Sequence, residues 1–337
     1  MSKKGILLVN LGTPDHPDVP AVKRYLDQFL MDERVIDIPK FNRTLLVKGI
    51  IVPFRSPKTA KLYREIWSEK GSPLLHYSKI QAQLLQEHLG TDYQVELAMR
   101  YQHPSIENAL QKLKANLVES IKVIPLFPQY ASASTGSVIQ LVMELVSKWP
   151  TIPPVSFVNS FHNNRQMIEV FAENARKHDI QSYDHVLFSF HGLPERQLLK
   201  CDHTGNYCLK VENCCDSLND TNKFCYSAQG HDTARLLAKE LGLPREKYTV
   251  CFQSRLGKEP WVQPYTTDVL KKLAAEGKKR LLVFSPAFVA DCLETLYEIT
   301  VEYHEEFRSL GGEHVQLVES LNDHPKFITA LAEMATA

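Results

Sequence analysis

Short apolar runs rich in β-branched residues recur along the whole chain, each bounded by Pro, Gly or Asn. Runs of this kind are typical of buried parallel strands, which are covered on both faces. They lie at residues 5–10, 94–99, 121–126, 155–158, 185–190, 248–252, 280–285 and 314–318.

Between these runs, apolar residues recur with the spacing of one helix face. The predicted helices cover residues 19–30, 78–89, 105–116, 137–148, 164–178, 233–241, 267–276, 291–310 and 325–334. Strands that alternate with helices predict an α/β protein with parallel sheets.

The length of 337 residues suits two domains of ordinary size. The Pro-rich stretch 149–154 is the natural boundary between them. We expect a first domain over residues 1–150 and a second over 151–321, with a C-terminal helix in 322–337 that packs back on the first.

The two halves of the chain resemble each other. GILLVNLGTP, from Gly5, aligns with HVLFSFHGLP, from His185, so that Leu11 falls on His191. Further on, HPSIENALQKL and IKVIPLFPQYAS align with QPYTTDVLKKL and RLLVFSPAFVAD. A duplicated fold with a histidine in one copy predicts a cleft between the halves, with the chemistry carried by the second half.

Composition narrows the class of protein. The apolar fraction of 44% and the charged fraction of 23% are those of a soluble globular protein. The formal net charge is zero, which gives no support to a nucleic-acid partner. No run approaches the roughly 20 apolar residues that span a bilayer, and the N-terminus lacks the features of a signal peptide. We therefore expect a cytoplasmic protein.

His191 is the first candidate for chemistry, because ligands of open α/β sheets bind beyond the carboxyl ends of the strands. The predicted helix after strand 280–285 carries Asp291, Glu294 and Glu298, spaced i, i+3 and i+7 along one face. The alternative is an acidic first turn favoured by the helix dipole, which accounts poorly for Glu298. Carboxylates near an imidazole suit delivery of a divalent cation and removal of protons.

Other polar residues follow strand ends in both halves. Arg100 and Tyr101 end the strand at 94–99, Ser254 follows the strand at 248–252, and Trp261 comes soon after. Arginine suits an anionic group and an aromatic ring suits a flat ligand. The Walker phosphate loop, the G-x-G-x-x-G fingerprint and the G-x-S-x-G elbow are all absent, which argues against nucleotide binding and serine hydrolysis.

The first half carries a longer excursion after its first strand, over residues 40–77. It is an apolar run that also contains Lys40, Arg43, Lys48, Arg55 and Lys58. One interpretation is a core helix with solvated basic residues. The others are an apolar lip over a cleft and a membrane-surface patch, and these two are compatible.

Taken together, the motifs of this chain closely resemble those of the ferrochelatases. The motifs LLVNLGTP, FRSPK, GSPL, MRYQHP, FPQYASASTGS, SFHGLP, FQSRLGKEPWVQPYT and ADCLETLYEI occur in the family's order from Gly5 to about Leu331. The resemblance implies insertion of ferrous iron, as substrate, into protoporphyrin IX to give protohaem. It also implies two similar Rossmann-like (chelatase) domains, each a parallel sheet flanked by helices, with the porphyrin in the cleft between them.

The family's functional residues fall on positions already singled out. The resemblance makes His191 the invariant imidazole and Glu294 the catalytic carboxylate, both near the iron, with Asp291 and Glu298 in an acidic path beside them. The implied porphyrin-binding residues are Leu11, Arg55, Tyr63, Arg100, Tyr101, Ser137, Ser254 and Trp261. His191 either accepts a pyrrole proton or binds iron in passing, since imidazole titrates near neutrality.

One segment departs from the family, as an insertion after SFHGLP over residues 198–226. It holds five of the chain's seven cysteines, Cys201, Cys208, Cys214, Cys215 and Cys225. In a cytoplasmic chain these are not expected to form disulfides. Four thiolates suffice for a [2Fe–2S] cluster or a structural zinc. We favour a cluster on Cys201, Cys208, Cys215 and Cys225, with zinc or unliganded thiols as alternatives.

Three alternatives to protoporphyrin ferrochelation remain open. The substrate is coproporphyrin III, the metal is cobalt, or the protein is a carrier of haem or iron without chemistry. A poorly soluble porphyrin substrate also favours peripheral contact with the inner face of a membrane and with other enzymes of the haem pathway.

Overall fold

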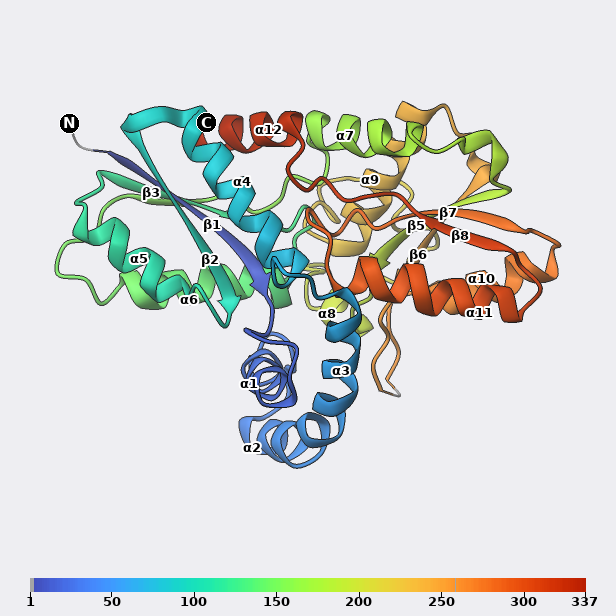
Figure 1. The fold of residues 1–337 in the computed structure, drawn as a ribbon, viewed down its shortest axis with the longest axis horizontal. Coiled ribbons are helices and arrows are strands. Elements are labelled where there is room, and N and C mark those ends of the chain that lie inside the picture. The colour runs from blue at the N-terminus through green and yellow to red at the C-terminus, as the bar shows by residue number, and fades with distance from the viewer. Residues whose placement is uncertain (1–2, 258) are drawn as a thin grey trace. The chain divides into compact units, whose positions relative to one another are not determined.

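The protein is described by a computed structural model covering residues 3–257 and 259–337, drawn as a ribbon in Figure 1. The chain forms two compact units. Unit 1 comprises Met1–Phe127, Ala131–Ser160 and Asn322–Ala337, and unit 2 comprises Pro128–Tyr130 and Phe161–Leu321.

Unit 1 is built on a four-stranded parallel sheet in the order β2-β1-β3-β4. Its strands are β1 (Lys4–Gly12), β2 (Tyr93–Tyr101), β3 (Ser120–Pro125) and β4 (Val155–Phe157). Its longer helices are α1 (Val19–Leu30), α3 (Val52–Ile66), α4 (Pro73–Leu89), α5 (Ile106–Ala115), α6 (Ser137–Val146) and α12 (Pro325–Thr336). Three short segments complete the unit, α2 (Lys40–Thr44) and the π-helical η1 (Leu45–Ile51) and η3 (Ser132–Gly136), with a 3-10 turn η2 (Gly90–Asp92) before β2.

Unit 2 repeats this topology with a second parallel sheet in the order β6-β5-β7-β8. Its strands are β5 (His185–His191), β6 (Tyr248–Gln253), β7 (Arg280–Phe284) and β8 (His314–Leu317). Its helices are α7 (Arg165–Arg176), α8 (Glu195–Leu199), α9 (Tyr226–Leu241), α10 (Thr266–Ala275) and α11 (His304–Ser309), with the π-helix η6 (Glu294–Tyr303) and the 3-10 turns η4 (Ile180–Ser182) and η5 (Arg245–Lys247). The predicted α/β class with two similar parallel sheets is confirmed.

Both sheets are covered on their faces by helices, which explains why the strand sequences are apolar throughout. In unit 1, Leu7 and Val9 of β1 are fully buried against Leu110 of α5 and Val142 of α6. In unit 2, Leu187 of β5 is buried in a second cluster with residues of α10, η6 and α11. A parallel strand with both faces packed has no position for a solvated side chain.

Several helices begin where a polar side chain caps the first turn. Asp18 accepts a hydrogen bond from the Ala21 amide at 2.8 Å, Ser105 from Asn108 at 3.2 Å and Asn164 from Met167 at 2.9 Å. Each oxygen satisfies one of the amides that the start of a helix leaves without a partner. The C-terminal helix α12 packs on α4, and Gln81 of α4 donates to the Asn322 carbonyl at 2.7 Å.

A glycine is the last residue of β1 and another directly follows β5, each for a steric reason. Gly12 has φ +118°, and a Cβ there would lie 2.1 Å from the Tyr101 carbonyl oxygen. At Gly192 a Cβ would lie 2.8 Å from the Gln253 carbonyl oxygen. The backbone of the neighbouring strand comes too close for any side chain at either position, so the two halves share this local solution.

The segment after β7 differs from the expected α-helix over residues 291–310. The π-helix η6 covers its first part, and Asp291 precedes that helix altogether. The prediction that Asp291, Glu294 and Glu298 line one α-helical face is therefore wrong. The sequence pattern did not reveal the wider turn, because an apolar residue every three or four positions fits both kinds of helix in a short window.

In the described residues, no helix is long and apolar enough to cross a membrane.

Candidate active site

His191 is the last residue of β5 and stands beside Gln253 of β6 in the parallel register. The next amide, Gly192, donates to the Gln253 carbonyl at 2.8 Å, which fixes the turn after the strand. The imidazole is partly exposed and meets the ring of Phe288 edge-on, with 6.4 Å between ring centroids. A half-exposed imidazole at a strand end is accessible to a ligand and held by a rigid backbone.

The turn after His191 pairs with the segment that carries Trp261. The Val262 amide donates to Leu193 at 2.9 Å, and the Glu195 amide donates to Pro260 at 3.1 Å. The Trp261 ring packs on Gly192, where a Cβ would lie 3.1 Å from it. The indole nitrogen is buried and has no hydrogen-bond partner among the described residues. The fold therefore brings two predicted site residues, His191 and Trp261, to one turn.

Glu294 begins η6, just beyond the end of β7, the other neighbour of β5. Its carboxylate accepts a hydrogen bond from the thiol of Cys292. Burial raises the pKa of the Cys292 thiol well above its usual range, and the adjacent carboxylate raises it further. Cys292 therefore remains a neutral donor at neutral pH.

Glu298 is the most heavily hydrogen-bonded carboxylate of this group. It accepts bonds from the Ser254 amide at 2.9 Å, the Ser254 hydroxyl at 2.6 Å, the Gln253 side chain at 3.0 Å and the Tyr303 hydroxyl at 2.8 Å. Ser254 itself has φ +66°, a conformation that the two hydrogen bonds from its amide and hydroxyl to Glu298 hold in place. Burial, and then Glu298, raise the pKa of Tyr303, which stays protonated. Glu298 thus joins the end of β6 to η6.

The remaining acids lie in different surroundings. Asp291 is buried and accepts bonds from the Thr295 hydroxyl at 3.2 Å and the Ser320 amide at 3.3 Å. Glu302 was not among the predicted site residues. Its pKa is raised by partial burial and then by the neighbouring charges of Glu298 and Glu305. Glu298 and Glu302 lie four residues apart on η6.

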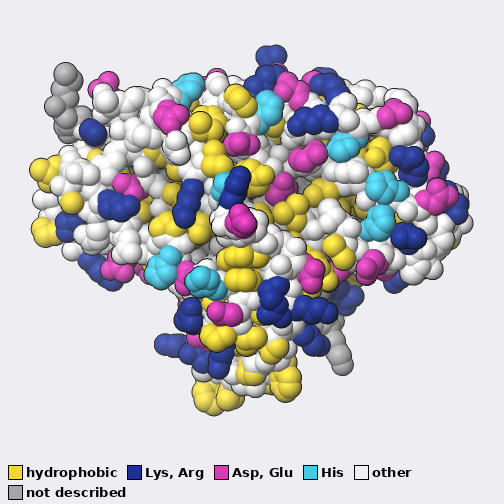
Figure 2. All heavy atoms as spheres, in the orientation of Figure 1, with side chains coloured by type: hydrophobic (Ala, Val, Ile, Leu, Met, Phe, Trp, Pro, Cys, Tyr) yellow, Lys and Arg dark blue, Asp and Glu magenta, His cyan; other side chains and the backbone are white. Residues whose placement is uncertain are grey.

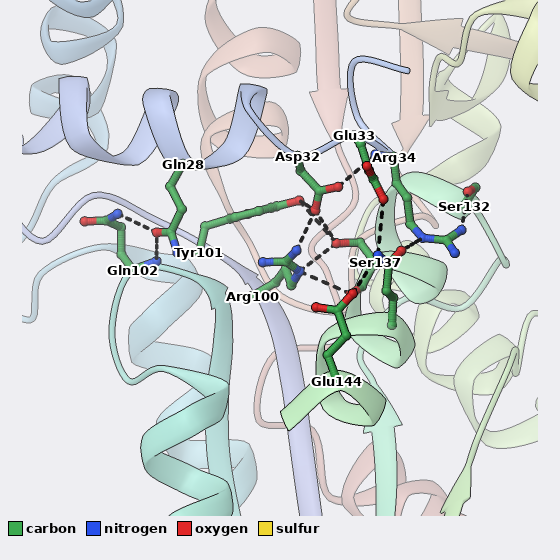
Figure 3. A network of polar contacts seen from close by, with 11 residues as sticks. Gln28, Asp32, Glu33, Arg34, Arg100, Tyr101, Gln102, Ser132, Ser137 and Glu144 are labelled. Atoms are coloured by element: carbon green, nitrogen blue, oxygen red, sulfur yellow. Dashed lines mark hydrogen bonds and ion pairs between the residues drawn. The ribbon is translucent and has the colours of Figure 1, made fainter. Parts of the chain in front are cut away.

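In unit 1, Arg100 is held by Asp32 and Ser137, as Figure 3 shows. Arg100 donates to the Asp32 carboxylate at 2.6 Å and to the Ser137 hydroxyl at 2.6 Å. The same Asp32 oxygen accepts from the Tyr101 hydroxyl at 2.9 Å and from Ser137 at 2.5 Å. The structure therefore brings the predicted residues Arg100, Tyr101 and Ser137 together around one carboxylate.

Asp32 is the residue that sequence reasoning missed. Its partners lie 68, 69 and 105 residues away in the chain, so no local spacing connects them. Tyr101 is 0% exposed, and burial followed by the Asp32 charge raises its pKa, so its hydroxyl remains a donor. The Arg100 side chain is 15% exposed, whereas that of Asp32 is 6% exposed.

The other predicted residues of unit 1 are not part of this network. Leu11 is partly exposed near the end of β1, and Arg55 is exposed on α3. Tyr63 is buried, with its ring edge-on to those of Tyr25 and Trp67.

All five cysteines of residues 200–225, which we call the cysteine-rich segment, line one cavity of unit 2 together with Leu198 and Asn222. Cys225 is its centre: the neighbouring Cys208 and Cys215 thiols lower the pKa of Cys225, and burial followed by the charge of Cys225 raises the pKa of Cys201. The Cys214 sulfur lies 3.8 Å from that of Cys215.

Polar side chains fold the cysteine-rich segment into this shape. Asp202 accepts from the amides of Tyr207 and Cys208 at 2.8 and 2.9 Å. Asn222 donates to the Cys214 carbonyl at 2.8 Å. No disulfide joins the described cysteines, and no three His, Cys, Asp or Glu side chains in residues 3–257 and 259–337 are arranged around a single metal ion.

The second sheet thus has a strand-end imidazole on β5 and a carboxylate-rich π-helix after the adjacent strand β7, in an α/β protein with two similar parallel sheets. Two solved structures share the fold. SirB from Bacillus subtilis with Fe3+ has a TM-score of 0.54 over 99% of this chain and 94% of that one, at 13% identity. The sirohydrochlorin chelatase SirB with cobalt has a TM-score of 0.51 with the same coverage and identity.

Sequence relatives identify the family. The ferrochelatase family model matches residues 3–337. A ferrochelatase of Legionella pneumophila (strain Paris) is 45% identical over 331 residues, covering 98% of this chain and 97% of its own. One of Coxiella burnetii (strain Dugway 5J108-111) is 44% identical over 334 residues, covering 99% and 93%. The chain belongs to the ferrochelatase family, and its activity is that of a lyase with ferrous iron as substrate.

The Asp32 network yields a prediction about stability. Asp32→Asn keeps the shape of the side chain but removes the charge that Arg100 faces. Breaking a buried ion pair from one side costs about 3 kcal/mol or more, so we expect unfolding at a clearly lower urea concentration. Glu144→Gln, which changes an exposed acid bonded to Gln140, is the matched control. Equal urea midpoints for Asp32→Asn and the wild type would contradict the role of Asp32.

Proposed function

We propose that this chain inserts ferrous iron into protoporphyrin IX to give protohaem, with His191 as the base near the pyrrole nitrogens and Glu294 as the carboxylate that moves protons or metal. The observation that carries this proposal is that His191 ends β5 while Glu294 begins η6 beyond β7, the adjacent strand. Carboxyl ends of neighbouring parallel strands meet at one edge of the sheet.

The chemistry needs such a pair. Metal insertion requires both pyrrole protons to leave, and a group titrating near neutrality suits their removal. Glu294, Glu298 and Glu302 follow one another at intervals of four residues on η6, and burial followed by the charges of Glu298 and Glu305 raises the pKa of Glu302. A row of carboxylates attracts a divalent cation and can release protons in return.

The proposed porphyrin contacts use the polar residues of both units. Arg100, oriented by Asp32 and Ser137, suits a propionate carboxylate, because charge-assisted bonds from arginine are strong and directional. Trp261 suits one flat face of the macrocycle. The other residues proposed to bind porphyrin are Leu11, Arg55, Tyr63, Tyr101, Ser137 and Ser254.

We expect His191→Ala and Glu294→Ala each to lower kcat at least about a hundredfold, the usual size of a lost acid–base group. Porphyrin affinity, measured by fluorescence quenching, should change only a few-fold. His88→Ala and Glu246→Gln are surface controls that should retain wild-type turnover. If both site variants kept full activity, the proposed mechanism would be wrong.

The same assay separates the alternatives. Faster turnover of coproporphyrin III than of protoporphyrin IX would change the substrate, and preference for Co2+ would change the metal. Binding of porphyrin and iron without conversion to haem would favour a carrier.

We also propose that the cysteine-rich segment holds a [2Fe–2S] cluster on Cys201, Cys208, Cys215 and Cys225. Three observations support this proposal. All five thiols line one cavity, and the other three proposed ligands interact with Cys225. The Cys225 sulfur also accepts hydrogen bonds from the amides of Ser227 and Ala228 at the start of α9. The neighbouring Cys208 and Cys215 thiols, and to a smaller extent these two amides, lower the pKa of Cys225 to about 3, which favours the thiolate.

A cluster suits this set of thiols better than zinc does. Zinc needs four ligands around one point, whereas a [2Fe–2S] cluster takes two thiolates on each of two irons. A bound cluster would supply cross-links within the segment and one-electron chemistry.

Anaerobically purified protein should contain about two irons and two acid-labile sulfides per chain, with visible absorption that dithionite bleaches. Serine at Cys201, Cys208, Cys215 or Cys225 should remove both, whereas Cys214→Ser, the matched control, should retain them. Bound zinc without sulfide would favour the structural-zinc alternative. Protein with neither metal would leave the thiols unliganded and refute the proposal.

We further propose that the excursion at 40–77 binds the cytoplasmic surface of an anionic membrane. There the protein can receive a poorly soluble porphyrin and pass haem on to other enzymes of the haem pathway. Hydrophobic side chains gather over α2 and α3 with Lys and Arg around them, as Figure 2 shows. The apolar lip consists of Phe41, Leu45, Ile50 and Phe54, which are 57–74% exposed.

The charges around the lip support this proposal. Lys40, Lys48 and Lys58 are exposed and can meet lipid phosphates. Arg43 does not take part, because it is buried and donates to the carbonyls of Ile36 and Ile38, both at 3.2 Å.

Phe41→Ser with Phe54→Ser should weaken binding to phosphatidylglycerol vesicles at least about tenfold, since burying a Phe contributes about 1.5–3 kcal/mol. Cosedimentation with vesicles measures this, and added salt should weaken the remaining binding. Met143→Gln, an exposed apolar residue on α6, is the control. Unchanged binding of the double variant would rule out the lip as the membrane contact.

A further inference from the structure

Gln253 is a buried polar residue at the edge of the second sheet that no step of the proposed chemistry uses. It is the last residue of β6, is 1% exposed, and lies opposite His191 in the parallel register of β5 and β6. A primary amide has two N–H donors and an oxygen that can accept two hydrogen bonds. When such a group is buried, each donor and acceptor needs a partner.

Both donors of the Gln253 amide bond to η6. Its Nε2 donates to the Glu298 carboxylate at 3.0 Å and to the backbone carbonyl of Glu294 at 3.3 Å. A carbonyl and an ionised carboxylate can only accept, which fixes the orientation of the amide. The Glu298 carboxylate is itself held by Ser254 and Tyr303. The start of η6, where Glu294 lies, is thus tied to the end of β6.

The amide oxygen of Gln253 bonds to the two neighbours of this start. It accepts from the Ser189 hydroxyl at 2.8 Å, and Ser189 lies two residues before His191 in β5. The Ser285 hydroxyl, directly after β7, shares its hydrogen between this oxygen at 3.4 Å and the Ser189 carbonyl at 3.3 Å. Both serines are almost fully buried. One side chain therefore connects β5, the end of β7 and η6.

The backbone of Gln253 holds the other member of the proposed catalytic pair. Its carbonyl accepts the Gly192 amide at 2.8 Å, directly after His191. A Cβ at Gly192 would lie 2.8 Å from the same oxygen, so the turn after His191 lies close against Gln253. The backbone of Gln253 thus locates the His191 turn, and its side chain locates Glu294.

Filling space in the core does not require this amide. An apolar side chain of the same length would pack there without any buried donor or acceptor to satisfy. The bonds to Ser189 and to Glu294 instead give Gln253 a directional role, because a buried and satisfied polar network fixes the places of its members.

We propose that Gln253 is a positioning residue, whose side chain sets the place of Glu294 relative to His191. The inference rests on the proposed function, since it concerns the same pair of residues. Gln253 acts through the Glu294 backbone and needs no contact with porphyrin or iron. A carboxylate displaced from the imidazole by a fraction of an ångström would slow the chemical step more than it would weaken binding.

The test is Gln253→Met, which keeps the length of the side chain and removes its hydrogen bonds. We expect kcat to fall about tenfold while KM for ferrous iron and for protoporphyrin IX stays within about twofold. Gln81→Met is the matched control, because Gln81 of α4 is also buried and donates to the Asn322 carbonyl at 2.7 Å. It should lower the thermal midpoint as Gln253→Met does but retain wild-type kcat.

A double variant separates positioning from general destabilisation. In Glu294→Ala the carboxylate is already missing, so adding Gln253→Met should change kcat less than about twofold. A further tenfold loss in that background would overturn the proposal, because Gln253 would then act through another residue. Wild-type kcat in folded Gln253→Met would overturn it as well.

If Gln253→Met does not fold, Ser189→Ala with Ser285→Ala takes its place. This pair leaves Gln253 and its bonds to η6 intact but removes the donors that hold the amide oxygen. We expect kcat to fall about threefold at unchanged KM, and wild-type kcat would overturn the positioning role. Full activity of His191→Ala and Glu294→Ala would instead refute the proposed function, so the two failures are distinguishable.

Discussion

The parallel pairing of β5 with β6 and β7 is the constraint on which the candidate site of unit 2 depends. Parallel strands end at the same edge of a sheet, so His191, Ser254 and the start of η6 meet there although they are far apart in the chain. Because both faces of the sheet are buried, this edge cannot shift without disturbing the core. A base held on such an edge is accurately placed even though its side chain is partly exposed.

Each unit uses one carboxylate to hold the residues at the end of its outer strand. Asp32 gathers Arg100, Tyr101 and Ser137 after β2, and Glu298 gathers its donors, Ser254 among them, after β6. Ionised carboxylates can accept several bonds at once, which makes them suited to joining segments that carry mainly donors. The two halves therefore share not only a topology but also a way of ordering polar side chains, and only the second half places an imidazole beside it.

Two segments extend this common plan. The excursion at 40–77 leaves Phe41 and Phe54 exposed among lysines, a surface that a core helix would have buried. The cysteine-rich segment lies between the turn after His191 and the helix that packs under β5, so its five thiols are close in the chain to the candidate site. The place of each segment in the fold thus decides what it can affect: the excursion presents a surface, and the cysteine-rich segment lies near the candidate site in the chain.

The sequence by itself determined the α/β class, the eight strands of the described residues and the duplication, and it selected His191 and Glu294 as candidates, because apolar periodicity and motif order are local properties of the chain. The tertiary structure decided what depends on contacts between distant segments. Asp32 has no local signal, since its partners are 68 to 105 residues away. The π-helix η6, which leaves Asp291 outside the row of acids, packs Ile299 and Tyr303 into the core of unit 2, and no spacing of residue types records that arrangement.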